Sequence, residues 1–81
     1  MTPMHTSKFD WSLVRSFLAV LDQGSLLGAA RVLHMSQPTL GRHVVELEAQ
    51  LGTVLFERTG RGLVPTAIAQ KLADSARAME T

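Results

Sequence analysis

The chain has 81 residues, an apolar fraction of 46% and a formal net charge of +1. A chain of this length forms one domain with a modest core, and its apolar fraction argues against wholesale disorder. It lacks cysteine, which excludes a disulfide framework, and it has neither a secretion signal nor an apolar stretch of about 18 residues, so we expect a cytoplasmic protein without membrane contact.

The start of the chain predicts a flexible arm and a first helix. Residues 1–9 are largely polar, and we expect them to form the arm. Asp10 is a favourable N-cap for a helix over about residues 11–23, and Gly24 supplies its end. Apolar residues recur at helical spacing and predict the buried stripe of this helix: Leu13, Val14, Phe17, Leu18 and Leu21.

Two further helices joined by a short turn are predicted next. Ser25 is a good N-cap for a short second helix that ends near residue 33. Ser36 is a good N-cap for a third helix that runs to about residue 50, with Gly52 beyond it as terminator. This arrangement is that of a helix-turn-helix.

The remaining segment predicts a hairpin and a last helix. Two β-prone runs, 54–56 and 63–65, flank a glycine-rich basic loop at 57–62, which is typical of a small hairpin or wing. A fourth helix, capped by Thr66, carries residues at 3-4-3 spacing, typical of packing against another helix: Ala69, Leu72, Ala76 and Met79. We expect these four residues to form a dimer contact, with packing onto the domain's own core as the alternative.

The elements together predict a mainly α fold. It comprises a winged helix-turn-helix over residues 10–65, with three helices and a two-stranded hairpin, and a linker or dimerisation helix over residues 66–81. Although the net charge is small, two segments, 23–45 and 58–73, hold basic residues and no acid. Such segments are compatible with an ordinary solvated surface or with one basic face for nucleic acid.

The two faces of the third helix differ in a way that bears on function. At about 100° per residue, one face is the core stripe, formed by Leu40, Val44, Leu47 and Leu51. The other face is small and apolar around a single arginine: Pro38, Arg42, Val45 and Ala49, with Gly41 on one flank and Glu46 on the other. In a major groove, Arg42 would pair with guanine, Gln37 with adenine and Val45 with a thymine methyl. A protein partner would also favour small apolar residues, so this alternative remains open.

Several motifs then support a family resemblance. Ser36-Gln-Pro is followed by Leu40-x-Arg, Leu47-Glu-x-x-Leu-Gly and Leu55-Phe-x-Arg. With these motifs the chain resembles the N-terminal winged helix-turn-helix domain of LysR-type transcriptional regulators, over residues 9 to about 80. The resemblance implies a bacterial transcription factor that binds double-stranded DNA as a homodimer. The third helix would enter the major groove, the wing would contact the backbone or minor groove, and the linker helix would dimerise.

Site residues follow from this resemblance position by position. Base contacts fall to Gln37 and Arg42, and phosphate contacts to the helix starts and the wing. The full expected DNA-binding set is Ser25, Ser36, Gln37, Pro38, Thr39, Gly41, Arg42, Val45, Arg58 and Arg61. Gly41 departs from the family, which usually has serine there, so one polar contact is missing. Family members continue into an effector-binding domain, and we expect that domain to be absent from this chain.

Other classes of function have weaker support. His43 and Glu46 lie at i, i+3, but a third metal ligand is missing. No nucleophile, base and orienting residue converge, and no phosphate-binding loop follows a strand, so neither an enzyme nor a cofactor is expected. The alternative to DNA binding is a winged-helix module for protein interaction. Salt dependence distinguishes the two, since only phosphate contacts release counterions.

Overall fold

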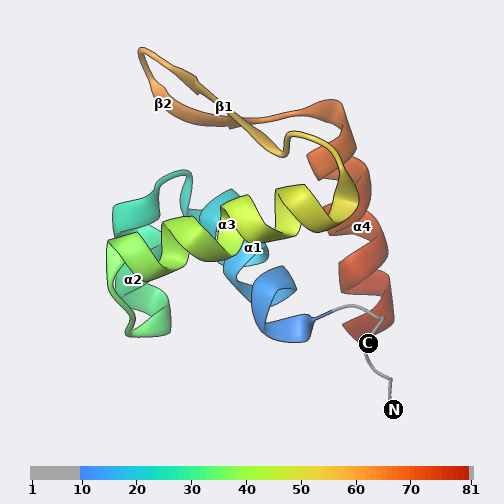
Figure 1. Cartoon of the computed structure of the whole chain (residues 1–81), viewed down its shortest axis with the longest axis horizontal. Helices are drawn as coiled ribbons and strands as arrows, with labels where there is room; N and C mark the ends of the chain where they lie inside the picture. Colours follow the sequence, from blue (N-terminus) through green and yellow to red (C-terminus); the bar gives the residue numbers. More distant parts are fainter. Residues whose placement is uncertain (1–9, 81) are drawn as a thin grey trace.

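The computed structural model describes residues 10–80, with the backbone alone at residue 80, and the predicted arm at 1–9 lies outside this range. The elements follow one another as α1 (Trp11–Gln23), α2 (Leu26–Leu33), α3 (Gln37–Leu51), β1 (Phe56–Thr59), β2 (Gly62–Pro65) and α4 (Ala67–Glu80). Figure 1 shows α3 crossing the body of the molecule, with the hairpin on one side and α4 at one end. The mainly α winged fold predicted from the sequence is confirmed. Within the described residues, no helix is long and apolar enough to span a bilayer.

Local sequence signals set the helix boundaries. Asp10, Ser25 and Ser36 each accept a hydrogen bond from a backbone N–H two or three residues further on, and so satisfy donors that the first turn leaves free. Gly24 and Gly52 adopt left-handed conformations, with φ of 75° and 70°, and end α1 and α3. The predicted caps of α1, α2 and α3 are therefore confirmed.

The core consists of two clusters that share the helix α1. One joins α1 to α4 and to the end of α3, and the other packs α1, α2 and α3 together around Ala29 and Ala30. Phe56 of β1 packs against both clusters. The predicted burial of Leu51 is wrong, since this side chain is 39% exposed. Leu51 is the last residue of α3, and Leu55, which is 0% exposed, shares the cluster of Leu47 instead.

The wing is a tighter hairpin than the sequence predicts. β1 pairs antiparallel with β2 from Phe56 opposite Pro65 to Thr59 opposite Gly62, so that two residues form the turn in place of a loop over 57–62. The strand does not begin at residue 54, because side chains outside the hairpin form hydrogen bonds with the backbone of residues 54 and 55. The Glu48 carboxylate accepts from the N–H of Leu55 at 2.8 Å, and the Thr66 hydroxyl donates to the carbonyl of residue 54 at 2.8 Å.

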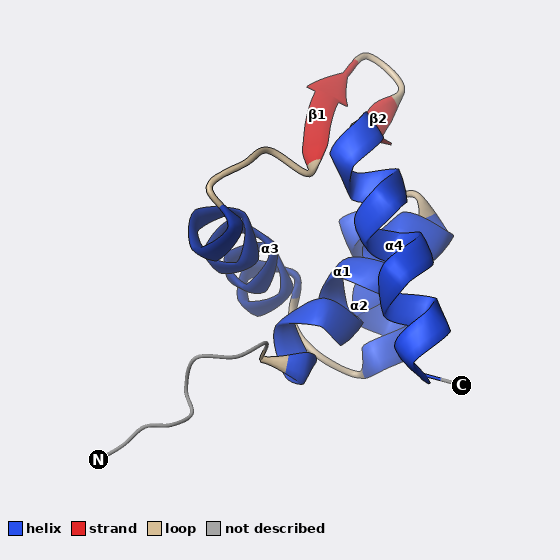
Figure 2. Ribbon diagram, turned by 90° about the vertical axis from the view of Figure 1, so that its right-hand side faces the viewer, coloured by secondary structure: helices blue, strands red, loops and turns tan. Residues whose placement is uncertain are grey.

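Helix α4 packs against the body through alanines. Ala69, Ala73 and Ala76 are all at most 3% exposed and lie in the cluster with α1. For Ala69 and Ala76 this corrects the expected dimer contact, because both side chains are covered within the chain. Figure 2 shows α4 lying along the helical body. An ion pair between Arg77 and Asp22 also ties α4 to α1.

Candidate nucleic-acid interface

Helix α3 presents its second face to solvent. Leu40, Val44 and Leu47 are buried against the body, at no more than 7% exposure. Arg42 on the opposite face is exposed, and Val45 is 63% exposed. The first turn also presents exposed Gln37 and Pro38, whereas Thr39 is only half-buried. Within residues 10–80, the helix therefore offers an exposed surface that combines one guanidinium with small apolar groups and, on one flank, the Glu46 carboxylate.

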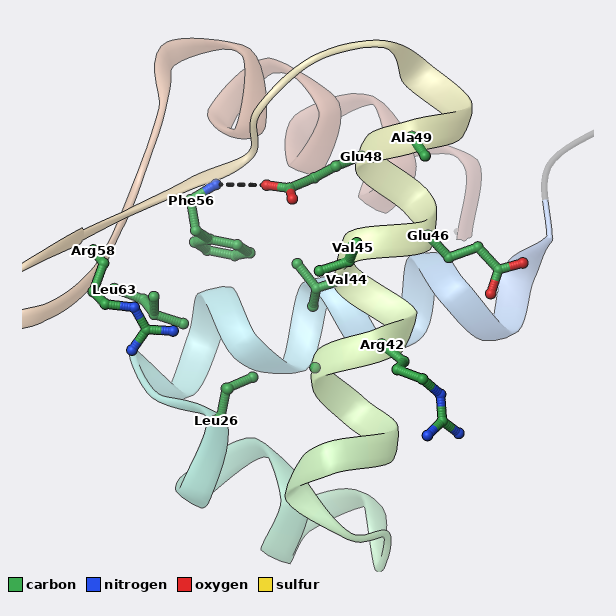
Figure 3. Close-up of a pocket in the computed structure, with 11 residues that line it drawn as sticks. Leu26, Arg42, Val44, Val45, Glu46, Glu48, Ala49, Phe56, Arg58 and Leu63 are labelled. Carbon is green, nitrogen blue, oxygen red and sulfur yellow. Dashed lines mark hydrogen bonds between the residues drawn. The ribbon is translucent and has the colours of Figure 1, made fainter.

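A groove of about 610 Å³ lies between α3 and the wing (Figure 3). Its apolar lining comes from both elements and from α2: Leu26, Val44, Val45, Phe56 and Leu63. Arg58 extends from the wing at one end, and Arg42 projects from the side of α3 that faces away from the wing. Arg42 and Arg58, which are far apart in the sequence, are thus both lining residues of this groove, but their side chains lie on opposite sides of α3 (Figure 3). Arg61 lies in the hairpin turn and does not line the groove.

Glu48 fixes the wing relative to α3. Its Oε2 accepts from the backbone N–H of Leu55 at 2.8 Å and of Phe56 at 3.4 Å, so a carboxylate on α3 holds the segment that leads into β1. Sequence reasoning assigned no role to this residue. The available signal was the Leu47-Glu48 motif, which lies one turn before the end of a helix that the wing follows.

The serines at the helix starts already act as caps. Ser25 Oγ accepts from the N–H of Gly28 at 3.0 Å. Ser36 Oγ accepts from the N–H of Thr39 at 3.2 Å and donates to the Thr39 hydroxyl at 3.0 Å. Both serines are exposed. An anion at either helix start would therefore meet the backbone N–H groups that remain free in the first turn.

Gly41 has no packing reason to be glycine. A Cβ built at this position would lie 3.9 Å from Leu26 Cδ1, which is an ordinary van der Waals contact. Glycine inside a helix costs about 0.5–1 kcal/mol relative to alanine. Among residues 10–80, therefore, no packing contact requires a glycine at this position of α3.

The residues considered as metal ligands do not form a site. Among residues 10–80, no group of three His, Cys, Asp or Glu side chains gathers in a way that would hold a metal ion. His43 Nδ1 instead shares a hydrogen bond of 2.8 Å with the hydroxyl of Ser16 on α1. The charged side chains that line the groove are two arginines, Arg42 and Arg58, and two glutamates, Glu46 and Glu48.

Known proteins are similar to this chain in sequence. The family profile described as "Bacterial regulatory helix-turn-helix protein, lysR family" matches residues 11–70. The HTH-type transcriptional regulator ClcR of Pseudomonas putida is 47% identical over 64 residues, which are 79% of this chain and 22% of ClcR. The chain therefore spans about a fifth of the length of the curated relatives it matches.

Two solved structures of similar domains include DNA. The structure described as a CbnR_DBD-DNA complex superposes with a TM-score of 0.82 at 38% identity, over 88% of this chain and 82% of that chain. The structure described as a BenM_DBD/catB site 1 DNA complex superposes with a TM-score of 0.83 at 31% identity, over 88% of this chain and 80% of that chain. Both structures are described as complexes with DNA.

Proposed function

The chain belongs to the lysR family of bacterial regulatory helix-turn-helix proteins, and from this premise we propose that it is the DNA-binding domain of a longer transcriptional regulator. It binds double-stranded DNA with sequence specificity. Residues 10–65 form the binding domain, and α4 (Ala67–Glu80) serves as the linker helix. The observation that carries the proposal is the groove between α3 and the wing, which Arg42 and Arg58 both line.

Helix α3 supplies the base contacts in this proposal. Arg42 donates two hydrogen bonds to a guanine, Gln37 pairs with an adenine, and Val45 meets a thymine methyl. A good bidentate contact contributes about 1–3 kcal/mol of discrimination against the wrong base. The support is geometric, because all three side chains are exposed on a helix whose opposite face is buried.

The flanking groups supply contacts to the DNA backbone. Arg58 at the groove and Arg61 in the hairpin turn contact phosphates, as do the helix starts at Ser25 and Ser36. These contacts position the protein without reading sequence. Gly41 allows the DNA to approach α3 closely, which accounts for a glycine that the packing of the domain does not require.

Dimerisation through α4 is also part of the proposal, with a corrected set of residues. The inward alanines are covered, but Ile68 is 50% exposed, Met79 is 55% exposed and Leu72 is half-buried. Their spacing of four and seven residues places them on one side of the helix. We expect a second copy to cover this side, and substitution of Ile68 by Glu to shift any dimer towards monomer in analytical ultracentrifugation.

The salt dependence of binding tests whether DNA is the partner. Labelled duplex DNA of random sequence is titrated with the chain at several salt concentrations. If several cationic groups contact phosphates, log K falls linearly with log salt, with a slope of about −0.9 for each phosphate neutralised. Absence of binding at low salt, or a flat dependence, would refute the proposal and favour a protein partner.

A further inference from the structure

Polar contacts hold helix α3 on both flanks of its buried stripe. On one flank, His43 Nδ1 lies 2.8 Å from Ser16 Oγ, and Ser16 is a buried polar residue on α1, 1% exposed. On the other flank, the Glu48 carboxylate accepts from two backbone N–H groups at the start of the wing. At about 100° per residue, His43 lies about 60° to one side of Leu40 and Glu48 about 80° to the other.

These positions matter for the direction of Arg42. The buried stripe of Leu40, Val44 and Leu47 is made of aliphatic side chains, whose contacts are non-directional. Hydrogen bonds on opposite flanks are directional, and together they resist rotation of the helix about its own axis. We propose that His43, through its hydrogen bond with Ser16, is a positioning residue that sets the rotation of α3 and thereby the base discrimination of Arg42. This inference rests on the function proposed above.

The size of the effect follows from the radius of a helix. A rotation of about 10° displaces an atom about 6 Å from the helix axis by about 1 Å. The useful range of N–H···O distances is only about 0.5 Å wide, so a displacement of this size disrupts a bidentate contact with a base. Contacts with phosphates tolerate it better, because a flexible side chain can follow a charge that lies outside the groove. Loss of the His43–Ser16 bond is therefore expected to reduce discrimination more than affinity.

The test compares four single variants and one double variant on two DNA duplexes. One duplex carries the site that the chain selects from random DNA, and the other has a change at the base pair where Arg42→Ala loses its preference. His43→Leu and Ser16→Ala remove the hydrogen bond, whereas His43→Gln retains a side chain able to make it. Gln50→Leu is the matched control, because Gln50 lies exposed on the same flank of α3 and its side chain makes no hydrogen bond within residues 10–80.

The ratio of the two dissociation constants is the readout, together with the free energy of unfolding in urea. A bidentate arginine contributes about 5- to 150-fold to this ratio, and we expect His43→Leu and Ser16→Ala to reduce it at least about threefold. His43→Gln restores most of the ratio and Gln50→Leu leaves it unchanged. The double variant Ser16→Ala with His43→Leu should show the same ratio of dissociation constants as His43→Leu alone, because both substitutions remove the same hydrogen bond.

The outcomes separate the two proposals. A wild-type chain with no preference between the duplexes overturns the proposed function and this inference with it. A wild-type chain with a clear preference that His43→Leu retains overturns this inference alone. Equal weakening on both duplexes, in step with a lower free energy of unfolding, also overturns it, because that pattern belongs to a residue that only stabilises the fold.

Discussion

Replacing Gly41 by alanine is expected to stabilise the domain and weaken its binding to DNA. Gly41 lies within α3, where glycine is unfavourable because its backbone loses the most conformational freedom on folding. The added Cβ meets only Leu26 Cδ1, at 3.9 Å, so no atom of the domain has to move. The substitution therefore gains helix propensity without strain.

The gain follows from the helix propensities. Alanine is favoured over glycine in a helix interior by about 0.5–1 kcal/mol, and the free energy of unfolding should rise by that amount. For a domain of 60–100 residues, a change of about 1 kcal/mol raises Tm by about 4–8 °C. Urea denaturation followed by circular dichroism measures the change directly, with equal m-values for both proteins as the check on two-state behaviour.

Gly28→Ala is the control for a helical glycine with different surroundings. A Cβ at Gly28 would lie 3.1 Å from Gln23 Cβ and 3.2 Å from Ser25 Oγ, so the neighbours would have to move and the cap of α2 would be disturbed. We expect a smaller gain there, or a loss. If Gly41→Ala fails to stabilise the chain, the packing argument at this position is wrong. If it stabilises the chain and leaves DNA affinity unchanged, close approach of DNA to Gly41 is refuted.

Other predictions concern the caps and the two sides of the groove. Glu48→Ala leaves two backbone N–H groups without their acceptor and should lower the free energy of unfolding in urea by about 1–3 kcal/mol, whereas Glu48→Gln should lower it less. His34 has a φ of 57°, so His34→Gly should raise the free energy of unfolding by about 1 kcal/mol and raise Tm with it. An unchanged Tm would count against left-handed strain at this position. The Ser12 hydroxyl holds the pKa of Asp10 below its usual value, so the ionised cap stabilises the fold at pH values above the pKa of the unfolded carboxyl. This stabilisation is lost as the pH falls through the lower pKa of the folded state. In acid titrations of unfolding, the difference in stability between the wild-type chain and Asp10→Asn should therefore shrink. Arg58→Ala should weaken binding to matched and scrambled duplexes alike and make the salt slope less steep by about one, and selective loss on the matched duplex would assign Arg58 a base contact instead.

The fold was predictable where local signals are strong. Asp10, Ser25 and Ser36 are favourable caps, and the period of Leu40, Val44 and Leu47 identifies the buried face of α3 without any tertiary information. Each of these signals depends only on residues close together in the sequence, so it can be recognised without knowledge of the tertiary contacts.

Features set by tertiary contacts were not predictable. The start of β1 depends on Glu48 and Thr66, which take the polar backbone atoms of residues 54–55 from outside the hairpin. The period of α4 is equally compatible with an outward seam and an inward one, and only the position of α1 shows that Ala69 is covered. For the same reason, sequence spacing gave no sign of the His43–Ser16 bond.

The sequence predicted only in part that both basic segments contribute to one groove. Arg42 and Arg58 each occur in an acid-free stretch, so a common basic face was one of the possibilities in the sequence. That both residues line one groove depends on the position of the wing beside α3, which the Glu48 hydrogen bonds hold.

Selection of bound sites from random duplex DNA tests the central claim most directly. We predict that the wild-type chain enriches a defined sequence with a guanine that Arg42→Ala no longer selects. If two copies bind, two such half-sites should lie about 10–10.5 base pairs or a multiple apart. Enrichment of no sequence by the wild-type chain, or of the same sequence with equal strength by Arg42→Ala, would contradict base reading by α3.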